Sequence, residues 1–144
     1  MAPPNNRLMI KTTTMINRFL FQISNGRIGG RFGKVDILLL TTKGRESGQD
    51  RTVPLQYFRD GDDLVLIPSN AGDDRDPAWW LNLKSDPNGV VQIGGEKTKV
   101  EARKATPEEK TRIWPDVTAV YPGYDEYQTR TSREIPVVIL KPAS

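Results

Sequence analysis

The chain has 144 residues without cysteine or histidine, and its 21 basic and 18 acidic side chains leave a net charge of +3 at pH 7. This length suits one domain with a single hydrophobic core. The absence of cysteine and histidine excludes disulfides, thiolate metal sites and nucleophilic mechanisms that need histidine. The acidic clusters at 60–63 and 73–76 do not follow the pattern of a calcium loop, so no metal site is predicted.

The N-terminal segment, residues 1–34, is basic and is predicted to stand apart from the domain at 35–144. It contains six Lys and Arg side chains and no Asp or Glu. Residues 7–25 show the periodicity of an amphipathic helix, and four glycines between 26 and 33 indicate a linker. Such a helix can lie on an anionic membrane surface or dock on the protein's own core, and the sequence leaves both open.

The chain shows no apolar run of membrane-spanning length and no signal peptide with its hydrophobic segment and cleavage site. The sequence therefore indicates a cytoplasmic protein, which the basic helix could hold at the inner face of the cell membrane.

From residue 35 onward, short runs of β-branched and aliphatic residues separated by turn signals indicate strands. Two short helices are inserted. One covers Ala78–Lys84 after an aspartate cap at Asp76, and the other begins at a capping box on Thr106 and ends before Pro115. The absence of βαβ alternation and of a GxGxxG motif favours a mainly β, α+β antiparallel barrel over a Rossmann sheet. The expected strands are 37–42, 52–58, 64–69, 90–93, 98–104 and 135–140.

The turn between the first two expected strands is suited to holding an anion. Gly44 and Gly48 let the backbone turn and approach a ligand. Arg45 and Arg51 carry planar donor groups that match phosphate or carboxylate oxygens, and Ser47 adds a hydroxyl. The alternative is an ordinary hairpin tip that faces water.

Two further segments carry polar or aromatic groups that could line a pocket. At 69–72 an expected strand ends in Ser-Asn-Ala-Gly, whose backbone N–H groups can meet a heterocycle or a phosphate, or simply form a loop exit. The adjacent Trp79 and Trp80 point about 100° apart on a helix, so we expect one in the core and the other over a pocket.

The tyrosines Tyr121, Tyr124 and Tyr127 are spaced to lie along one helical face. In a chain without histidine, tyrosine is the natural proton donor to a reduced quinone or carbonyl oxygen. A packing role, with the hydroxyls in water, is the alternative.

Together these motifs resemble the deazaflavin-dependent nitroreductase family of actinobacteria, which are coenzyme F420-dependent quinone reductases. The resemblance runs from residue 37 to 142 and is carried in order by 40–48 with Arg51, Pro54 and Leu55, then by 69–72, by 77–84 and by 121–136. It implies a six-stranded antiparallel split β-barrel, like the FMN-binding split barrels, as the coenzyme-binding domain at 35–144.

The resemblance also implies the location of the coenzyme F420 site. The phosphate and the oligoglutamate tail would lie over Arg45, Glu46, Ser47 and Arg51. The deazaflavin ring would lie among Pro54, Leu55, Ser69, Asn70, Ala71, Trp79 and Asn82. The acceptor side would be lined by Tyr57, Ser69, Tyr121, Tyr124 and Tyr127. In one departure, the family usually has lysine where this chain has Glu46, which should lower the affinity for anions.

The implied reaction is hydride transfer from reduced F420 to a menaquinone-like quinone or to a nitroaromatic or nitroimidazole acceptor. Ser69 and one tyrosine would bind the acceptor oxygen and supply a proton. The alternatives are an FMN-dependent split-barrel oxidoreductase and a non-enzymatic module that binds a deazaflavin or a flavin. A nucleic-acid partner is not expected, because the basic segment contains only phenylalanine among aromatics.

Overall fold

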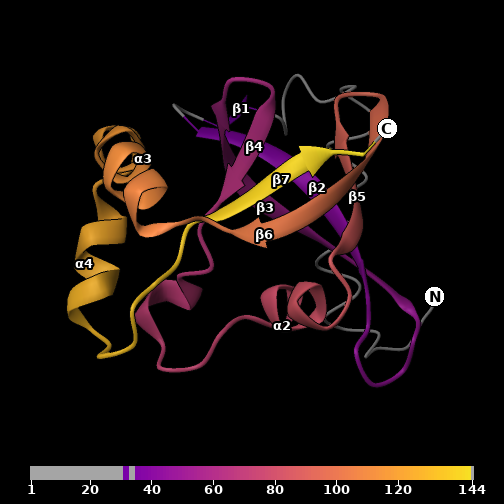
Figure 1. The fold of residues 1–144 in the computed structure, drawn as a ribbon, viewed down its shortest axis with the longest axis horizontal. Coiled ribbons are helices and arrows are strands. Elements are labelled where there is room, and N and C mark those ends of the chain that lie inside the picture. Colours follow the sequence, from indigo (N-terminus) through magenta and orange to yellow (C-terminus); the bar gives the residue numbers. More distant parts are fainter. Residues whose placement is uncertain (1–30, 33–34, 144) are drawn as a thin grey trace.

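The computed structural model describes residues 31–32 and 35–143, so the predicted helix at 7–25 lies outside the described residues. The strands form a barrel, with helix α2 (Ala78–Ser85) beneath it and helices α3 (Pro107–Val120) and α4 (Gly123–Thr129) stacked beside it (Figure 1). The site described below lies where the barrel is split, close to α2 on one side and to α3 and α4 on the other.

Six antiparallel strands close the barrel, as the sequence predicted. In order around the ring they are β2 (Val35–Lys43), β3 (Asp50–Asp60), β4 (Asp63–Leu66), β7 (Val138–Pro142), β6 (Glu96–Lys104) and β5 (Asn88–Ile93). Pairing of β5 with β2 completes the ring. The two-residue strand β1 (Arg31–Phe32) pairs antiparallel with the start of β2.

The strands contribute to two hydrophobic cores, one inside the barrel and one outside it, because successive side chains of a strand point to opposite faces of the sheet. The barrel-interior core includes Leu38, Leu40, Leu66 and Leu140 and is covered at one end by α2 (Ala78–Ser85). The outer core packs Val65, Ile67 and Ile139 against α3 (Pro107–Val120) and α4 (Gly123–Thr129). Both sets of helices are thus fixed to the barrel by buried apolar contacts.

The barrel is split between β3 and β4. Although β3 has eleven residues, it pairs with β4 only at Phe58, Arg59 and Asp60. β4 ends at Leu66, and the backbone N–H of Ser69 donates to the carbonyl of Ile67 at 2.8 Å, which turns the chain away from β3. Among the described strands, the edge of β3 that faces β4 is therefore unpaired from residue 51 to 57.

Three elements differ most from the prediction, for tertiary reasons, while the other strands differ by at most two residues at each end. The expected strands 64–69 and 135–140 are observed as 63–66 and 138–142, because residues 67–69 and 135–137 bend around the split. Helix α3 continues through Pro115 to Val120 instead of ending at Trp114. Burial of Ile113 and Val117 in the outer core stabilises this helix despite the backbone hydrogen bond that proline removes.

The capping predictions were confirmed for α3 and wrong for α2. At Thr106 the capping box forms, with reciprocal hydrogen bonds to Glu109 of 2.8 and 3.2 Å. The N-cap of α2 is Pro77, which makes no side-chain cap, whereas Asp76 forms ion pairs with Lys84 at 2.9 Å and Arg133 at 3.1 Å. Asp76 therefore connects α2 to the segment after α4.

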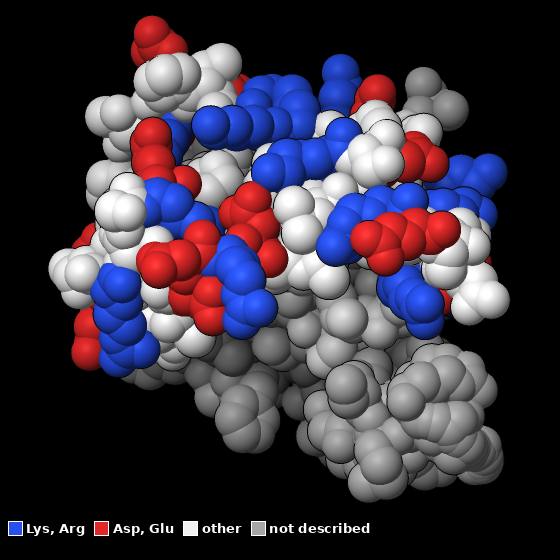
Figure 2. All heavy atoms as spheres, turned by 90° about the horizontal axis from the view of Figure 1, so that it is seen from below, with Lys and Arg blue, Asp and Glu red and all other residues white. Residues whose placement is uncertain are grey.

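The described surface is mixed in charge. On the face seen from beneath α2, Lys and Arg side chains are interspersed with Asp and Glu (Figure 2). No helix within residues 31–32 and 35–143 has the length and apolar character needed to cross a membrane. In the same residues, no group of three acidic side chains is placed to hold a metal ion.

Candidate active site

The turn at 44–49 is closed by its own backbone and by a hydroxyl. The N–H of Gly44 donates to the carbonyl of Gln49, and the N–H of Gly48 donates to the carbonyl of Gly44, both at 2.8 Å. A Cβ added at Gly44 would lie 2.8 Å from the Oγ of Ser47 and 3.2 Å from the carbonyl oxygen of Gln49, so a larger residue would displace the Ser47 hydroxyl. Arg51 Nη2 donates to the same Oγ at 3.3 Å, which holds its guanidinium over the turn.

Asn82 of α2 anchors this turn from below. Its Oδ1 accepts hydrogen bonds from the backbone N and from Nη1 of Arg45, both at 3.1 Å. Its Nδ2 donates to the hydroxyl of Thr42 at 3.1 Å, and the side chain is only 4% exposed. Asn82, expected beside the coenzyme ring, thus lies under Arg45 and orients it.

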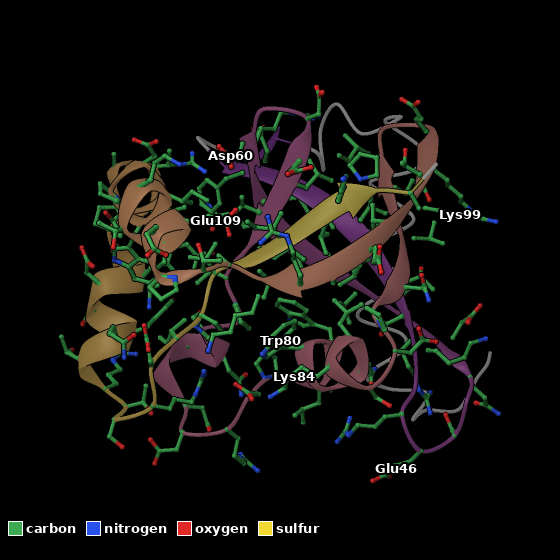
Figure 3. All side chains as sticks on the ribbon, in the orientation of Figure 1. Glu46, Asp60, Trp80, Lys84, Lys99 and Glu109 are labelled. Carbon is green, nitrogen blue, oxygen red and sulfur yellow. The ribbon has the colours of Figure 1, made fainter. Side chains whose placement is uncertain are left out.

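These residues border a cavity of about 310 Å³, which we call the arginine cavity. It is lined by Thr42, Gly44, Arg45, Glu46, Ser47, Arg51, Val53, Ala78, Trp79 and Asn82. The backbone N–H groups of Glu46 and Ser47 have no hydrogen-bond partner among the described residues. Glu46 itself is exposed at the tip of the turn, with its side chain directed away from the barrel (Figure 3). Two guanidinium groups and two free N–H groups make this cavity suitable for an anion.

The loop after β4 has a strained backbone. Asn70, Ala71 and Gly72 all have positive φ, at 47°, 55° and 85°. Such angles cost an alanine about 1 kcal/mol or more, so the surrounding structure must hold them. The loop turns the backbone of residues 69–71 toward a second cavity, and strain of this kind is common at functional sites.

Arg133 holds this loop in place. Its Nη2 donates to the carbonyls of Pro68 and Ser69 at 3.1 and 3.0 Å, and its Nε donates to the carbonyl of Asp73 at 3.0 Å. Its Nη1 pairs with the carboxylate of Asp76. From the sequence alone Arg133 is only one position of a motif, because its partners lie about sixty residues away in the chain.

The second cavity, about 520 Å³, is largely apolar and aromatic, and we call it the aromatic cavity. It is lined by Ile37, Val53, Leu55, Gln56, Leu66, Ile67, Ser69, Asn70, Ala71, Pro77, Trp79, Tyr121, Tyr124 and Tyr127. It opens at the unpaired edge of β3, which explains why both Leu55 and its neighbour Gln56 reach it. Val53 and Trp79 line both cavities, so the two cavities adjoin, and together we call them the groove.

The three tyrosines form a packed cluster at one wall of the aromatic cavity. The ring centroids lie 5.0 Å apart for Tyr121 and Tyr124 and 6.0 Å apart for Tyr124 and Tyr127. The hydroxyls of Tyr121 and Tyr127 are hydrogen-bonded at 3.1 Å, while that of Tyr124 donates to Gln56 Oε1 at 2.9 Å. Their predicted common helical face is replaced by a helix junction, with Tyr121 at the end of α3 and the other two on α4.

Burial and the neighbouring tyrosines raise the pKa of Tyr124 above its usual value of 10. The pKa of Tyr127 is also raised, first by its hydrogen bond with Tyr121 and then by desolvation. A raised pKa keeps a phenol protonated, so both hydroxyls are neutral at physiological pH.

The structure brings most of the predicted site residues into this groove. The arginine cavity holds Arg45, Glu46, Ser47, Arg51 and Asn82, and the aromatic cavity holds Leu55, Ser69, Asn70, Ala71, Trp79, Tyr121, Tyr124 and Tyr127. Two expected residues line neither cavity.

These two residues are Pro54 and Tyr57. Tyr57 is 7% exposed in the barrel-interior core, with the guanidinium of Arg59 5.5 Å from its ring centre. The residue that sequence reasoning missed is its neighbour, Gln56. The one available signal was a long polar side chain in the middle of an otherwise apolar strand.

Comparison with known proteins gives the family. A sequence model of the family described as F420H(2)-dependent quinone reductase matches residues 14–142. The F420H(2)-dependent quinone reductase Rv1261c of Mycobacterium tuberculosis is 40% identical over 125 residues, which cover 84% of each chain. The solved structure of an F420-H2 dependent reductase, FDR-A, has 38% identity and a TM-score of 0.67, and it covers 73% of this chain and 93% of its own.

A more distant structure shows the fold alone. It is a protein of Listeria innocua provisionally named a pyridoxamine 5′-phosphate oxidase, with 16% identity, a TM-score of 0.55, and coverage of 75% of this chain and 84% of its own. The split barrel is thus shared with proteins of little sequence similarity. The chain belongs to the F420H(2)-dependent quinone reductase family.

Proposed function

We propose that the protein reduces quinones with reduced coenzyme F420 as hydride donor. The observation that supports this best is the groove itself, in which the two cavities adjoin at Val53 and Trp79. It joins a cationic end to an apolar, aromatic chamber. A coenzyme with an anionic phosphate and oligoglutamate tail at one end and a flat ring at the other matches this arrangement.

The residues of the groove divide the binding task. Arg45, Arg51 and the free N–H groups of Glu46 and Ser47 would hold the phosphate and the tail. Leu55, Trp79 and the loop at 69–71 would hold the ring. When bound, the reduced coenzyme supplies a hydride.

The acceptor would occupy the part of the aromatic cavity next to the tyrosines. In the pair formed by Tyr121 and Tyr127, one hydroxyl donates to the other, so the second keeps a proton that it can donate to an acceptor oxygen. The hydroxyl of Ser69, at the start of the strained loop, is a second donor facing this space. A flat, menaquinone-like quinone fits such a chamber, and so does a nitroaromatic compound.

Titration of F420 with the purified protein tests this function. We expect saturable quenching of coenzyme fluorescence at micromolar protein, followed by reduction of menadione when reduced F420 is supplied. Absence of saturable binding would overturn the proposal, and binding without turnover of menadione or a nitro compound would leave only a coenzyme-binding module.

Arg51→Ala tests the anion site directly. Loss of charge-assisted hydrogen bonds should weaken coenzyme binding about tenfold or more. Arg59→Ala is the matched control, because Arg59 lies on the same strand but lines neither cavity of the groove. Equal affinities for the two variants would remove Arg51 from the phosphate site.

We also propose that the basic N-terminal segment holds the protein against the inner face of the cell membrane. A menaquinone-like acceptor is soluble in lipid, so a reductase at that surface would meet it where it is concentrated. The proposal rests on the six basic side chains of residues 1–34 and on the amphipathic pattern at 7–25.

A further inference from the structure

Gln56 has a hydrogen-bond donor that the fold leaves unused. It lies on the unpaired edge of β3, and its side chain lines the aromatic cavity. Its Oε1 accepts the hydrogen bond from Tyr124, but its buried Nε2 has no partner among the described residues. Buried polar atoms without partners are rare in folded proteins, and each calls for an explanation such as a bound ligand.

Tyr124 fixes the direction in which this amide points. Its side chain is 6% exposed and is packed between Phe58, Trp114 and the two other tyrosines, with ring centroids 5.0–6.5 Å away. A phenol has one hydrogen to donate, and that of Tyr124 goes to Gln56 Oε1. The Nε2 group is thereby held away from Tyr124.

The position of Gln56 along β3 indicates which molecule it meets. Val53 borders the arginine cavity, and Gln56 is three residues further along the strand, or about 10 Å. Gln56 does not line the arginine cavity, and it shares the aromatic cavity with Tyr121 and Tyr127. This end of the groove is the acceptor end.

We propose that Gln56 is an acceptor-binding catalytic residue whose Nε2–H donates a hydrogen bond to a carbonyl oxygen of the quinone, with Tyr124 as its positioning residue. This assignment rests on the proposed quinone reductase function. In the reaction the quinone gains two electrons and one hydrogen as a hydride, the coenzyme is oxidised by two electrons, and one further proton completes the hydroquinone.

The amide contributes by stabilising charge, not by transferring a proton. Negative charge develops on the quinone oxygen as the hydride is added, and an oriented N–H group in an apolar chamber stabilises it. An amide does not release its proton under these conditions. The completing proton therefore comes from the hydrogen-bonded pair Tyr121 and Tyr127 or from water.

The variant Gln56→Glu distinguishes the role of the amide's N–H donor from that of its oxygen acceptor. Glutamate has nearly the same volume and can still accept the hydrogen bond from Tyr124, but when ionised it offers no donor. We expect the dissociation constant for oxidised F420 to stay within about twofold and that for menadione, measured by calorimetry on the F420-saturated protein, to rise about tenfold. The ratio kcat/KM for menadione should fall by at least the same factor.

The pH profile of this variant adds a readout that a merely structural role would not change. Protonation of the introduced carboxyl restores an O–H donor, so activity relative to the unmodified protein should rise as pH falls. Gln92→Glu is the matched control, since Gln92 is a half-buried glutamine on β5 that lines neither cavity. It should leave both dissociation constants unchanged.

Other outcomes would overturn the assignment without touching the proposed function. An unchanged menadione affinity in Gln56→Glu, or a weaker affinity for F420 with normal menadione binding, would remove Gln56 from the acceptor end. If Gln56→Glu failed to fold, Gln56→Leu and Tyr124→Phe would take its place, and both should weaken menadione binding more than F420 binding. Failure of the unmodified protein to bind F420 would instead reject the function itself.

Discussion

Single residues decide how strongly the arginine cavity can attract an anion. Arg45 and Arg51 are both exposed, and between them Glu46 places a carboxylate at the tip of the turn. Glu46 makes no ion pair with any described residue. No described residue therefore neutralises its charge, which opposes the binding of a phosphate or of an oligoglutamate tail.

Glu46→Lys should raise the affinity for F420, because it replaces a repulsive charge with an attractive one. We expect an increase of about three- to tenfold at 50 mM salt that shrinks above 300 mM, since salt screens exposed charges. Fluorescence titration at both salt concentrations measures it. Glu101→Lys makes the same charge change on the exposed face of β6 and should have little effect.

The two residues at 56 and 57 show what the sequence could and could not predict at this scale. Arg45, Ser47 and Arg51 were predictable, because a short glycine-bracketed turn is formed by local contacts. The family resemblance implied Tyr57 at the acceptor side, but a shift of one residue in a strand moves a side chain to the other face, and Gln56 lines the aromatic cavity instead. The position of Gln56 depends on where β4 separates from β3, which is a non-local feature.

At the scale of elements, the start of α3 shows how one ion pair supports a helix. Arg103 of β6 binds Glu109 through two hydrogen bonds of 2.8 Å, and Glu109 also closes the capping box. The hydrogen bonds from Arg103, and then from the backbone N–H of Thr106, lower the pKa of Glu109 from 4.5 to about 2. The carboxylate thus ties the first turn of the helix to the barrel.

Glu109→Gln should make the free energy of unfolding depend less on pH in the acidic range. The unfolded chain binds more protons than the folded one between pH 4.5 and about 2, so the stabilisation by Glu109 is complete above pH 4.5 and is lost as pH falls toward 2. Urea denaturation at pH 6 and pH 3 should show a smaller difference between the two midpoints in the variant than in the unmodified protein.

Glu108→Gln serves as the control for this experiment. Glu108 lies in the same helical turn, is exposed, and its substitution removes the same charge without removing the bond to Arg103. Identical profiles for the two variants would show that the ion pair does not contribute.

Helix boundaries were less predictable than helix positions for a physical reason. The start of α3 follows from a local capping box, which the sequence displays. Its end depends on the outer core, where Ile113 before Pro115 and Val117 after it are both buried, so the helix continues past the proline. The start of α2 likewise depends on a distant residue, because Asp76 pairs with Arg133 and does not cap the helix.

At the scale of the whole molecule, charge is divided unevenly along the chain. Residues 1–34 carry six basic side chains and no acidic ones, whereas the remaining residues carry more acidic than basic side chains. On the face seen from beneath α2, the described residues accordingly show basic and acidic side chains mixed together (Figure 2). Attraction to an anionic surface should therefore come from the N-terminal segment.

The full chain should sediment with phosphatidylglycerol vesicles and not with phosphatidylcholine vesicles. Replacing Arg7, Lys11 and Arg18 by glutamine should release most of the protein, because each basic side chain near an anionic surface adds about 1 kcal/mol. The matched control replaces Lys97, Lys99 and Lys104 of β6, which are exposed. Equal sedimentation of the two triple variants would reject the N-terminal segment as the anchor.

The short ladder between β3 and β4 has a mechanical consequence for the barrel. β2 and β3 are joined over eight residue pairs, but β3 and β4 over three. The β2–β5 and β4–β7 ladders are equally short, but the β3–β4 junction borders the aromatic cavity through Gln56 and Leu66, so local opening there can admit a flat molecule while both cores stay packed. A ligand bound across the opening would contact both β3 and β4 and hold them together. Ligand binding and closure of the ring would therefore stabilise each other.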